Sequence, residues 1–408
     1  MSHLSVAPSL EDLGVDTLLA QARAATGLAD FGDPEFMPHL ARLAEAWRDE
    51  AGLNAFGRQV AHARTLGSLK NRLWAQACFA AVPDAIAAQR IAAPIVIIGP
   101  HRSGTTRLQR LLACDLRLAH LRTWEGMNPA PRSLPIDGRD IAQRRAEAEA
   151  ALAMRHARYP RAHAMHAMHA DWPEEEMLLL NHSFCSFSAL GLYDIPRWYR
   201  DWFAECDKTA SYAAMRRQLQ LVGHARGDTP GRRWLLKNPQ HMLDLPALLA
   251  VFPDASLVFI HRDPLKTVSS TLSMMTHFSA AHTDRDCQAS MRDTWLDFCE
   301  RSARRCIEAR AAIPRAQQLD LHYAEMSHDW RAAMRRVYDF AGLDFSPEAE
   351  AAMAGWMATS ERDAHHVRHQ HRLEDFGLDD ATIEARMGFA RRRFGIAVES
   401  RTEVTPAL

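Results

Sequence analysis

Gly99-Pro-His-Arg-Ser-Gly-Thr-Thr106 follows the apolar, β-branched run Pro94-Ile-Val-Ile-Ile98 and precedes a helical pattern that begins near Arg107. A strand, a glycine-bracketed turn and a helix together place backbone N–H groups and a helix N-terminus around a phosphate. The G-x-x-x-x-G spacing matches a nucleotide-triphosphate P-loop, but Thr105 stands where that motif has lysine, while Thr106 supplies the Ser/Thr hydroxyl. The segment therefore predicts a phosphate-bearing ligand, held without the lysine that grips β- and γ-phosphates.

Short apolar strand patterns alternate with helical patterns along the rest of the chain. Strands are expected at 94–98, 233–237, 256–260 and 318–322. This alternation predicts an α/β fold, in which a P-loop-like central parallel sheet is flanked by helices and helix outweighs strand. Residues 1–90 have an alanine-rich helical periodicity and predict an N-terminal helical extension to a domain over 91–400. The charged, alanine-rich stretch 139–168 also predicts a helix.

The composition excludes several classes of protein. The 408 residues carry a net charge of −1, so no overall field favours nucleic acid or an anionic membrane, and any anion site must be local. Seven cysteines, an odd number without a C-x-x-C pair, favour reduced thiols. We find no signal-peptide pattern and no apolar run of about 18 residues, and therefore expect a cytoplasmic chain without a membrane span. The oligomeric state cannot be read from the sequence.

A second group of polar residues follows the strand expected at 256–260. Arg262 lies at the carboxyl end of this strand, where open α/β sheets bind ligands, and Ser270 comes eight residues later, about two helical turns on. A guanidinium and a hydroxyl can both bind one phosphate. The alternative is an arginine paired with Asp263 and a serine on an ordinary helix face.

Lys237 closes the strand expected at 233–237, and Asn238-Pro239 ends that strand. A lysine in this place points at the same ligand edge of the sheet. The alternative is a solvated lysine at a strand end, which is the usual environment of this residue type.

These three elements together resemble the sulfotransferase superfamily, which uses 3′-phosphoadenosine 5′-phosphosulfate (PAPS). In that family, the first strand runs into a loop that holds the 5′-phosphosulfate. The residues that match this loop are Arg102, Ser103, Gly104, Thr105 and Thr106. The resemblance implies that Arg262 and Ser270 hold the 3′-phosphate, and that Lys237 contacts the transferring sulfuryl group, as in the tyrosylprotein-type branch. His101 departs from the pattern, because the family has proline directly before the basic residue.

The acceptor must lose a proton, and two residues compete as the general base. Glu125 lies in Thr-Trp-Glu-Gly, 23 residues after Arg102, which is similar to the position of the base in the tyrosylprotein-type branch. His241 follows Lys237 by four residues, whereas the family's histidine follows by two. We favour Glu125; the alternative is a surface carboxylate or an ion pair with Arg122 or Arg132. Pro173 with Glu174–Glu176 is typical of a helix start, although the resemblance also allows Glu175 or His169 to line an acceptor cleft.

The leading hypothesis is a PAPS-dependent sulfotransferase that moves a sulfuryl group to an acceptor hydroxyl or amine by in-line displacement. Arg102 and Lys237 are its expected cations. The acceptor is expected to be a small molecule, glycan or lipid. No metal is expected, because the leaving group is already a stabilised anion; the histidines that could suggest one are His163, His166, His169, His365, His366, His369 and His371. The rivals are a P-loop nucleotide or small-molecule kinase and a non-catalytic binding protein.

Overall fold

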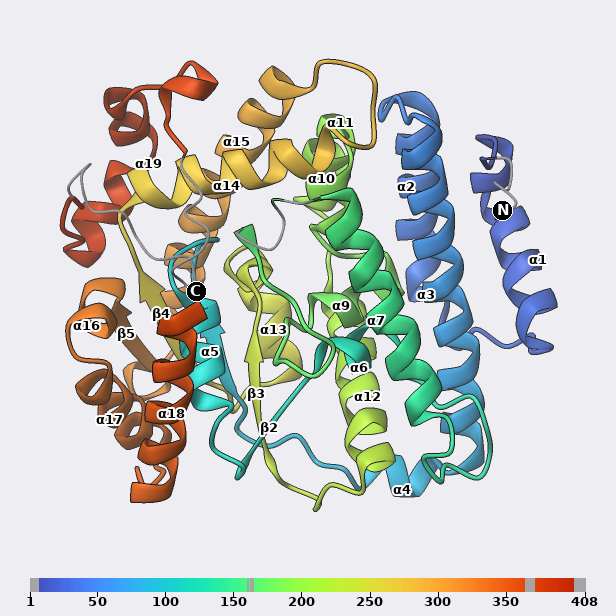
Figure 1. Cartoon of the computed structure of the whole chain (residues 1–408), viewed down its shortest axis with the longest axis horizontal. Coiled ribbons are helices and arrows are strands. Elements are labelled where there is room, and N and C mark those ends of the chain that lie inside the picture. The colour runs from blue at the N-terminus through green and yellow to red at the C-terminus, as the bar shows by residue number, and fades with distance from the viewer. Residues whose placement is uncertain (1–6, 160, 162–164, 364–370, 400–408) are drawn as a thin grey trace.

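A computed structural model of the chain describes residues 7–159, 161, 165–363 and 371–399, and the side chains of these residues except 361–363. Five strands form one sheet in the order β2-β3-β1-β4-β5, and every neighbouring pair is parallel (Figure 1). The strands are β1 (Ile95–Ile98), β2 (Leu118–His120), β3 (Arg233–Lys237), β4 (Ser256–His261) and β5 (Gln318–His322). The predicted α/β class with a central parallel sheet is therefore confirmed.

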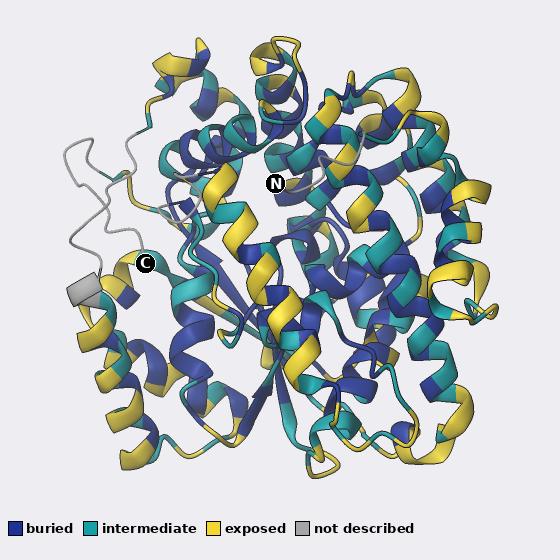
Figure 2. Ribbon diagram, turned by 45° about the vertical axis from the view of Figure 1, so that its right-hand side comes forward, coloured by how far each residue is buried: buried dark blue, intermediate teal, exposed yellow. Residues whose placement is uncertain are grey.

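Alternate residues of the central strands enter two different cores. Ile95 and Ile97 pack on one face of the sheet with the helices α5 and α16 to α18, whereas Val96 and Ile98 pack on the other with α9, α12, α13 and α15. The first face is covered by α5 (Thr105–Leu112), α16 (Tyr323–His328), α17 (Trp330–Ala341) and α18 (Pro347–Asp363). The second is covered by α9 (Met177–Leu180), α12 (Thr209–Arg226), α13 (Leu245–Val251) and α15 (Gln288–Arg310). Figure 2 shows the strands buried between these layers.

The N-terminal segment, predicted to be a helical extension, is helical and packs beside the sheet (Figure 1). Leu18, Leu40 and Leu69 belong to one core that also holds residues of the helices near the sheet's carboxyl edge, such as Trp295. The helices outside the two sheet faces are α1 (Val15–Thr26), α2 (Met37–Asp49), α3 (Ala55–Ala81), α4 (Pro83–Ala87), α6 (Thr123–Met127), α7 (Ile141–Arg158), α10 (Ser188–Leu192), α11 (Pro196–Trp198), α14 (Pro264–Ser279) and α19 (Asp380–Phe394). The division of the chain at residue 90 stays a prediction.

Two predicted helix limits are wrong. The helix expected over 139–168 ends at Arg158, because Tyr159 precedes a proline and leaves the helical region with φ −124° and ψ 77°. Pro173 does not begin a helix; it bridges to Arg122 in an extended pairing, and the next helix, α9, begins only at Met177. The three acidic residues between Pro173 and Met177 therefore lie outside a helix.

Among the described residues, no helix combines the length and the apolar character needed to cross a membrane. The cytoplasmic location stays a prediction from the sequence.

Candidate sulfuryl-donor site

The turn after β1 has the backbone geometry expected of an anion-binding loop. Arg102 and Gly104 both have positive φ, 66° and 94°. The Ser103 hydroxyl donates to Pro100 O at 2.7 Å, which closes the turn, and α5 begins directly after Gly104. Glycine is required at 104 for a second reason, because a Cβ there would lie 2.6 Å from the Tyr323 ring. The turn therefore leads its backbone N–H groups into a helix N-terminus, where anions are favoured.

Arg262 and Ser270 lie against this turn. Arg262 Nη1 donates to the backbone oxygen of Arg102 at 2.9 Å, and its guanidinium lies 3.9 Å from the centre of the Tyr323 ring. Arg102 Nε donates to Ser270 Oγ at 3.1 Å, and its Nη1 donates to Met165 O. The two phosphate elements that the sequence predicted separately thus meet at one edge of the sheet.

The guanidinium of Arg102 is partly buried and that of Arg262 is buried, and two such cations close together favour an anion between or beside them. Burial, and then the neighbouring Arg262 cation, lower the pKa of Arg102 to about 10. A lowered arginine pKa means that its charge is poorly solvated and poorly balanced, and a bound anion would restore that balance.

A carboxylate from the C-terminal segment already contacts Arg262. Glu399 accepts hydrogen bonds of 2.9 Å from both Nε and Nη2 of Arg262. The Glu399 backbone N–H donates to Asp263 at 2.8 Å, and Arg391 of α19 also binds Asp263, at 2.9 Å. The C-terminal segment therefore places a negative group on the arginine that was predicted to bind the 3′-phosphate.

Lys237 lies at the carboxyl end of β3 and is completely buried, so the alternative of a solvated lysine is wrong. Its Nζ donates to Thr106 Oγ1 of the turn at 3.3 Å and forms an ion pair with Glu175. The pairing of β3 with β1, in which Lys237 is level with Ile97, brings this lysine beside the turn.

Three consecutive carboxylates, Glu174 to Glu176, each contact a basic side chain. Glu174 lies 3.1 Å from His166 Nε2, Glu175 pairs with Lys237, and Glu176 contacts His241. Burial alone would raise the pKa of Glu174, but His166 and Lys237 outweigh it and lower that pKa to about 2. The signal for this group in the sequence is the acidic run Glu174–Glu176. Because the run follows Pro173, we interpreted it mainly as a helix start.

The two residues that the sequence suggested as general bases, Glu125 and His241, each contact other side chains of the fold. Glu125 is 2% exposed and accepts hydrogen bonds from Arg226 Nε, at 2.6 Å, and from the Arg122 backbone, at 2.9 Å. Glu125 is thus in an ion pair, but its main partner is Arg226; Arg122 Nε lies 3.9 Å away, and Arg132 pairs with Glu147 instead. His241 is fully buried, with Tyr212 OH 2.8 Å from its Nδ1 and Glu176 on its Nε2. Both residues therefore have their polar atoms engaged by the fold.

His101, the departure from the family's loop pattern, points into an aromatic cluster. Its ring centre lies 4.8 Å from that of Phe187, 5.5 Å from Trp295 and 5.9 Å from Phe298. Burial, with the nearby Lys237 and Arg102 cations, lowers the pKa of His101 to about 3. The inserted histidine is thus neutral at physiological pH and packs as part of the core.

Of the histidines considered as metal ligands, the three that the structure describes, His166, His169 and His371, have different partners. His163, His365, His366 and His369 lie outside the described residues. His166 is beside Glu174, the exposed His169 lies near Asp171, and His371 Nδ1 is 2.9 Å from the Ser269 hydroxyl.

Comparison with known proteins decides the family. The model of the sulfotransferase family matches residues 94–347, which hold the turn, Lys237, Arg262 and Ser270. The chain belongs to the sulfotransferase family. The computed structure superposes on sulfotransferase STF1 from Mycobacterium tuberculosis with a TM-score of 0.79 and 31% identity, covering 92% of this chain and 98% of that one. For sulfotransferase STF9 from Mycobacterium avium the TM-score is 0.81 and the identity 26%, covering 98% and 100%.

Among curated proteins, this sulfotransferase is similar to the omega-hydroxy-beta-dihydromenaquinone-9 sulfotransferase Stf3 of Mycobacterium bovis and Mycobacterium tuberculosis. The identity is 28% over 114 residues, or 27% of this chain. The match spans only 28% of those relatives' length. Family and fold are therefore settled over most of the chain, and the P-loop-like arrangement agrees with the sulfotransferase structures.

Proposed function

We propose that this sulfotransferase moves the sulfuryl group of PAPS to a hydroxyl or amine of a small-molecule or lipid acceptor. The observation that carries the proposal is the hydrogen-bonded junction of the turn with Arg262 and Ser270, beside Lys237. A bisphosphorylated adenosine needs an anion site at each end. In our proposal, Arg102 and the backbone N–H groups of residues 103–106 hold the 5′-phosphosulfate, and Arg262 with Ser270 holds the 3′-phosphate.

Sulfuryl transfer forms an S–O or S–N bond to the acceptor and breaks the S–O bond to adenosine 3′,5′-bisphosphate. Negative charge grows on the bridging oxygen as that bond breaks, and fixed cations stabilise it best when they are buried and already in place. Lys237 fulfils both conditions, since it is buried and its Nζ lies 3.3 Å from Thr106 Oγ1 of the turn.

We infer that Glu175, rather than Glu125 or His241, is the general base. Among the contacts of the described residues, Glu175 is the carboxylate on Lys237 Nζ, so it lies next to the proposed point of transfer. When the bridging oxygen of the donor binds beside Lys237 and shares its charge, the Glu175 carboxylate is available to accept the acceptor's proton. Glu125 is separated from this role by its bond to Arg226.

An acceptor of lipid or small-molecule type is proposed because the curated relatives are named for a hydroxylated menaquinone. The proposed reaction does not require a divalent cation, since Lys237 and the two arginines supply positive charge. This differs from a P-loop kinase, which holds Mg²⁺ with its triphosphate.

The proposal is tested by incubating the enzyme with ³⁵S-labelled PAPS and a panel of alcohols, phenols, quinols and lipid alcohols, with EDTA present. We expect label in at least one organic acceptor, with equimolar release of adenosine 3′,5′-bisphosphate. Lys237→Met is expected to abolish the transfer. It also leaves the buried Glu175 carboxylate without its partner and lowers the melting temperature, so transfer is measured well below that temperature, where circular dichroism shows the variant folded.

Two results would contradict the proposal. The first is unchanged labelling of the acceptor by both Arg102→Ala and Lys237→Met, which would place the chemistry elsewhere. The second is Mg²⁺-dependent transfer of phosphate from ATP to the same panel, which would favour the kinase alternative.

A further inference from the structure

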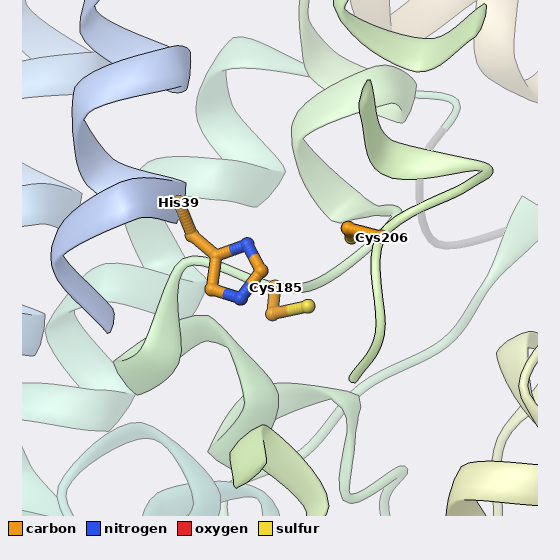
Figure 3. A group of neighbouring side chains, drawn as sticks. All are labelled: His39, Cys185 and Cys206. Atoms are coloured by element: carbon orange, nitrogen blue, oxygen red, sulfur yellow. The ribbon is translucent and has the colours of Figure 1, made fainter. Parts of the chain in front are cut away.

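A second reactive group lies away from the donor site, where three segments meet. His39 of α2, Cys185 after the helical turn 181–183 and Cys206 after the helical segment 199–203 lie close together (Figure 3). The ring nitrogen and the two sulfur atoms all lie within 4.8 Å of one another. Both cysteines are free thiols. They are 21 positions apart in the sequence, and the fold brings their sulfur atoms together.

The backbone beside the pair is strained. Phe184, directly before Cys185, has a φ of 54°, in the left-handed region that a phenylalanine seldom adopts. Strain of this kind persists where the surrounding structure fixes the local geometry, and it is found most often at functional positions. Here it holds Cys185 in the position that faces Cys206.

The two sulfurs have different surroundings. Cys185 is fully buried, whereas Cys206 is partly exposed, so a small oxidant can reach Cys206 first. His39 and the buried Lys208 lie beside Cys206, and Lys208 also pairs with Asp244 at 2.9 Å. Hydrogen bonding from Cys185, then His39 and the Lys208 charge, lower the pKa of Cys206 to about 5, although burial opposes this.

Burial and the same hydrogen bond act on Cys185 in the opposite direction and raise its pKa well above that of an ordinary thiol. The Cys206 sulfur is therefore the more acidic and the more exposed of the two, and Cys185 is its buried partner. Attack by a thiolate and resolution by an adjacent thiol is the sequence of steps that ends in a disulfide.

We propose that Cys206 and Cys185 are a peroxide-sensitive pair that closes reversibly to a disulfide. The Cys206 thiolate attacks one peroxide oxygen: an S–O bond forms, the O–O bond breaks, and the leaving hydroxide takes a proton to become water. Cys185 sulfur then attacks Cys206 sulfur: the S–S bond forms and the S–O bond breaks. The hydroxide of the sulfenic acid leaves as water with the Cys185 proton. Two electrons pass from the two thiols to one hydrogen peroxide.

The loop that would carry the disulfide is hydrogen-bonded to the segment next to Lys237 that holds His241. Gln240 Nε2 donates to the Cys185 backbone oxygen at 3.0 Å and to Asp244 at 2.7 Å, and Gln240 Oε1 accepts from Phe187 N at 2.9 Å. The loop that holds Cys185 is thereby bound to the helical turn that directly follows β3.

The test is to treat the whole, reduced chain with a small excess of hydrogen peroxide at neutral pH and to map its thiols by mass spectrometry. We expect a cross-linked peptide pair containing Cys185 and Cys206, a mass lower by two hydrogen atoms, and full recovery with dithiothreitol. Cys206 is expected to react at least about tenfold faster than Cys114, because the thiolate is the nucleophile and burial raises the pKa of Cys114 to about 11.

Three variants make the result specific. Cys206→Ser should lose the fast reaction, whereas Cys185→Ser should keep it and accumulate a sulfenic acid that dimedone traps. Cys114→Ser, a half-buried cysteine on another part of the chain, should respond to peroxide as the wild type does. Circular dichroism of each variant confirms that the fold is kept.

The proposal would be overturned if Cys206 reacts no faster than Cys114, or if peroxide yields no Cys185–Cys206 cross-link. It would also be overturned if the purified chain holds one zinc ion that each of His39→Ala, Cys185→Ser and Cys206→Ser removes, since the group would then be a metal site. These readouts need no sulfuryl acceptor, so they are independent of the proposed transfer reaction.

Discussion

Arg262 Nη1 donates a 2.9 Å hydrogen bond to the backbone oxygen of Arg102, which ties the end of β4 to the turn after β1. The two residues are 160 positions apart in the chain, and the parallel pairing of β1 with β4 brings their strand ends to the same edge. The Arg102 side chain in turn bonds to Ser270 of α14 at 3.1 Å. In the proposed function, this junction is where the two ends of one bisphosphorylated nucleotide are held.

Arg262→Ala is expected to lower the affinity for adenosine 3′,5′-bisphosphate by about 10- to 100-fold, the range for a lost charge-assisted hydrogen bond. The affinity for adenosine 5′-monophosphate should change little, because that nucleotide has no 3′-phosphate. Isothermal titration calorimetry with both ligands measures the difference. Ser270→Ala, which leaves the Arg262–Arg102 bond intact, should show the same preference loss to a smaller degree. An equal loss for both ligands would mean that Arg262 does not read the 3′-phosphate.

Glu399→Gln is expected to raise the affinity for adenosine 3′,5′-bisphosphate severalfold. The Glu399 carboxylate contacts Arg262 through two 2.9 Å bonds, so a 3′-phosphate must compete with it. Removal of its charge weakens that competition. Glu350→Gln is the matched control, because Glu350 pairs with the exposed Arg331 on other helices. Tighter binding by both variants would show a general charge effect, and unchanged binding by Glu399→Gln would rule out competition.

Glu175→Gln is expected to reduce the turnover number of sulfuryl transfer by about 100-fold or more, with a small change in donor affinity, since general-base catalysis contributes about 10²- to 10⁴-fold. Initial rates under saturating PAPS, together with bisphosphate binding, separate the two effects. A loss of bisphosphate affinity as large as the loss of turnover would show that Glu175 acts in binding and would contradict its assignment as the base.

Glu125→Gln is the control for that experiment and has a different expected result. Its carboxylate is buried and bonded to Arg226, so removal of the charge weakens this pair, although Arg226 keeps a 3.6 Å pair with Asp228, and lowers stability by about 1.5–3 kcal/mol. Transfer by the folded fraction should continue. If Glu125→Gln loses turnover while Glu175→Gln keeps it, the base assignment made from the sequence was right after all.

His101 predicts a loss of stability on mild acidification. Its pKa is about 3 when folded, below the unfolded value of about 6.5, so between these values the unfolded chain binds more protons. The stabilisation that neutral, buried His101 contributes is therefore complete above about pH 6.5 and falls as the pH drops toward 3.

Urea unfolding between pH 8 and 5 should show a falling free energy of unfolding. His101→Gln should reduce that slope by up to about 1.4 kcal/mol per pH unit and run parallel to the wild type above pH 6.5. Identical slopes would show that His101 is not buried neutral.

The sequence predicted the parts of the fold with strong local signals. The β-branched run before Gly99, the Ser256–Ile260 run and the Pro264 helix start were all predicted correctly, because a continuous apolar run and a proline are signals that act over a few residues. The strand β2 was missed, since its three residues, Leu118–His120, are too few for any pattern.

Partners across the chain were harder to predict. Glu125 was expected to act near Arg102 because its spacing and its Trp-Glu context resemble the family, but Arg226, 101 residues further on, determines its surroundings. Similarly, the Glu175–Lys237 pair joins residues 62 positions apart, and the local sequence Pro173–Glu176 does not predict it. Strand order and the packing of loops across the sheet edge determine such contacts, and one sequence does not encode them in a readable pattern.

The most direct test of the account is a parallel calorimetric titration of the wild-type chain with adenosine 3′,5′-bisphosphate and with ATP in the presence of Mg²⁺. The junction of Arg102, Arg262 and Ser270 predicts tight binding of the bisphosphate and little binding of ATP, because the turn has Thr105 in place of the P-loop lysine. Equal affinity for the two nucleotides, or tighter binding of ATP, would contradict it.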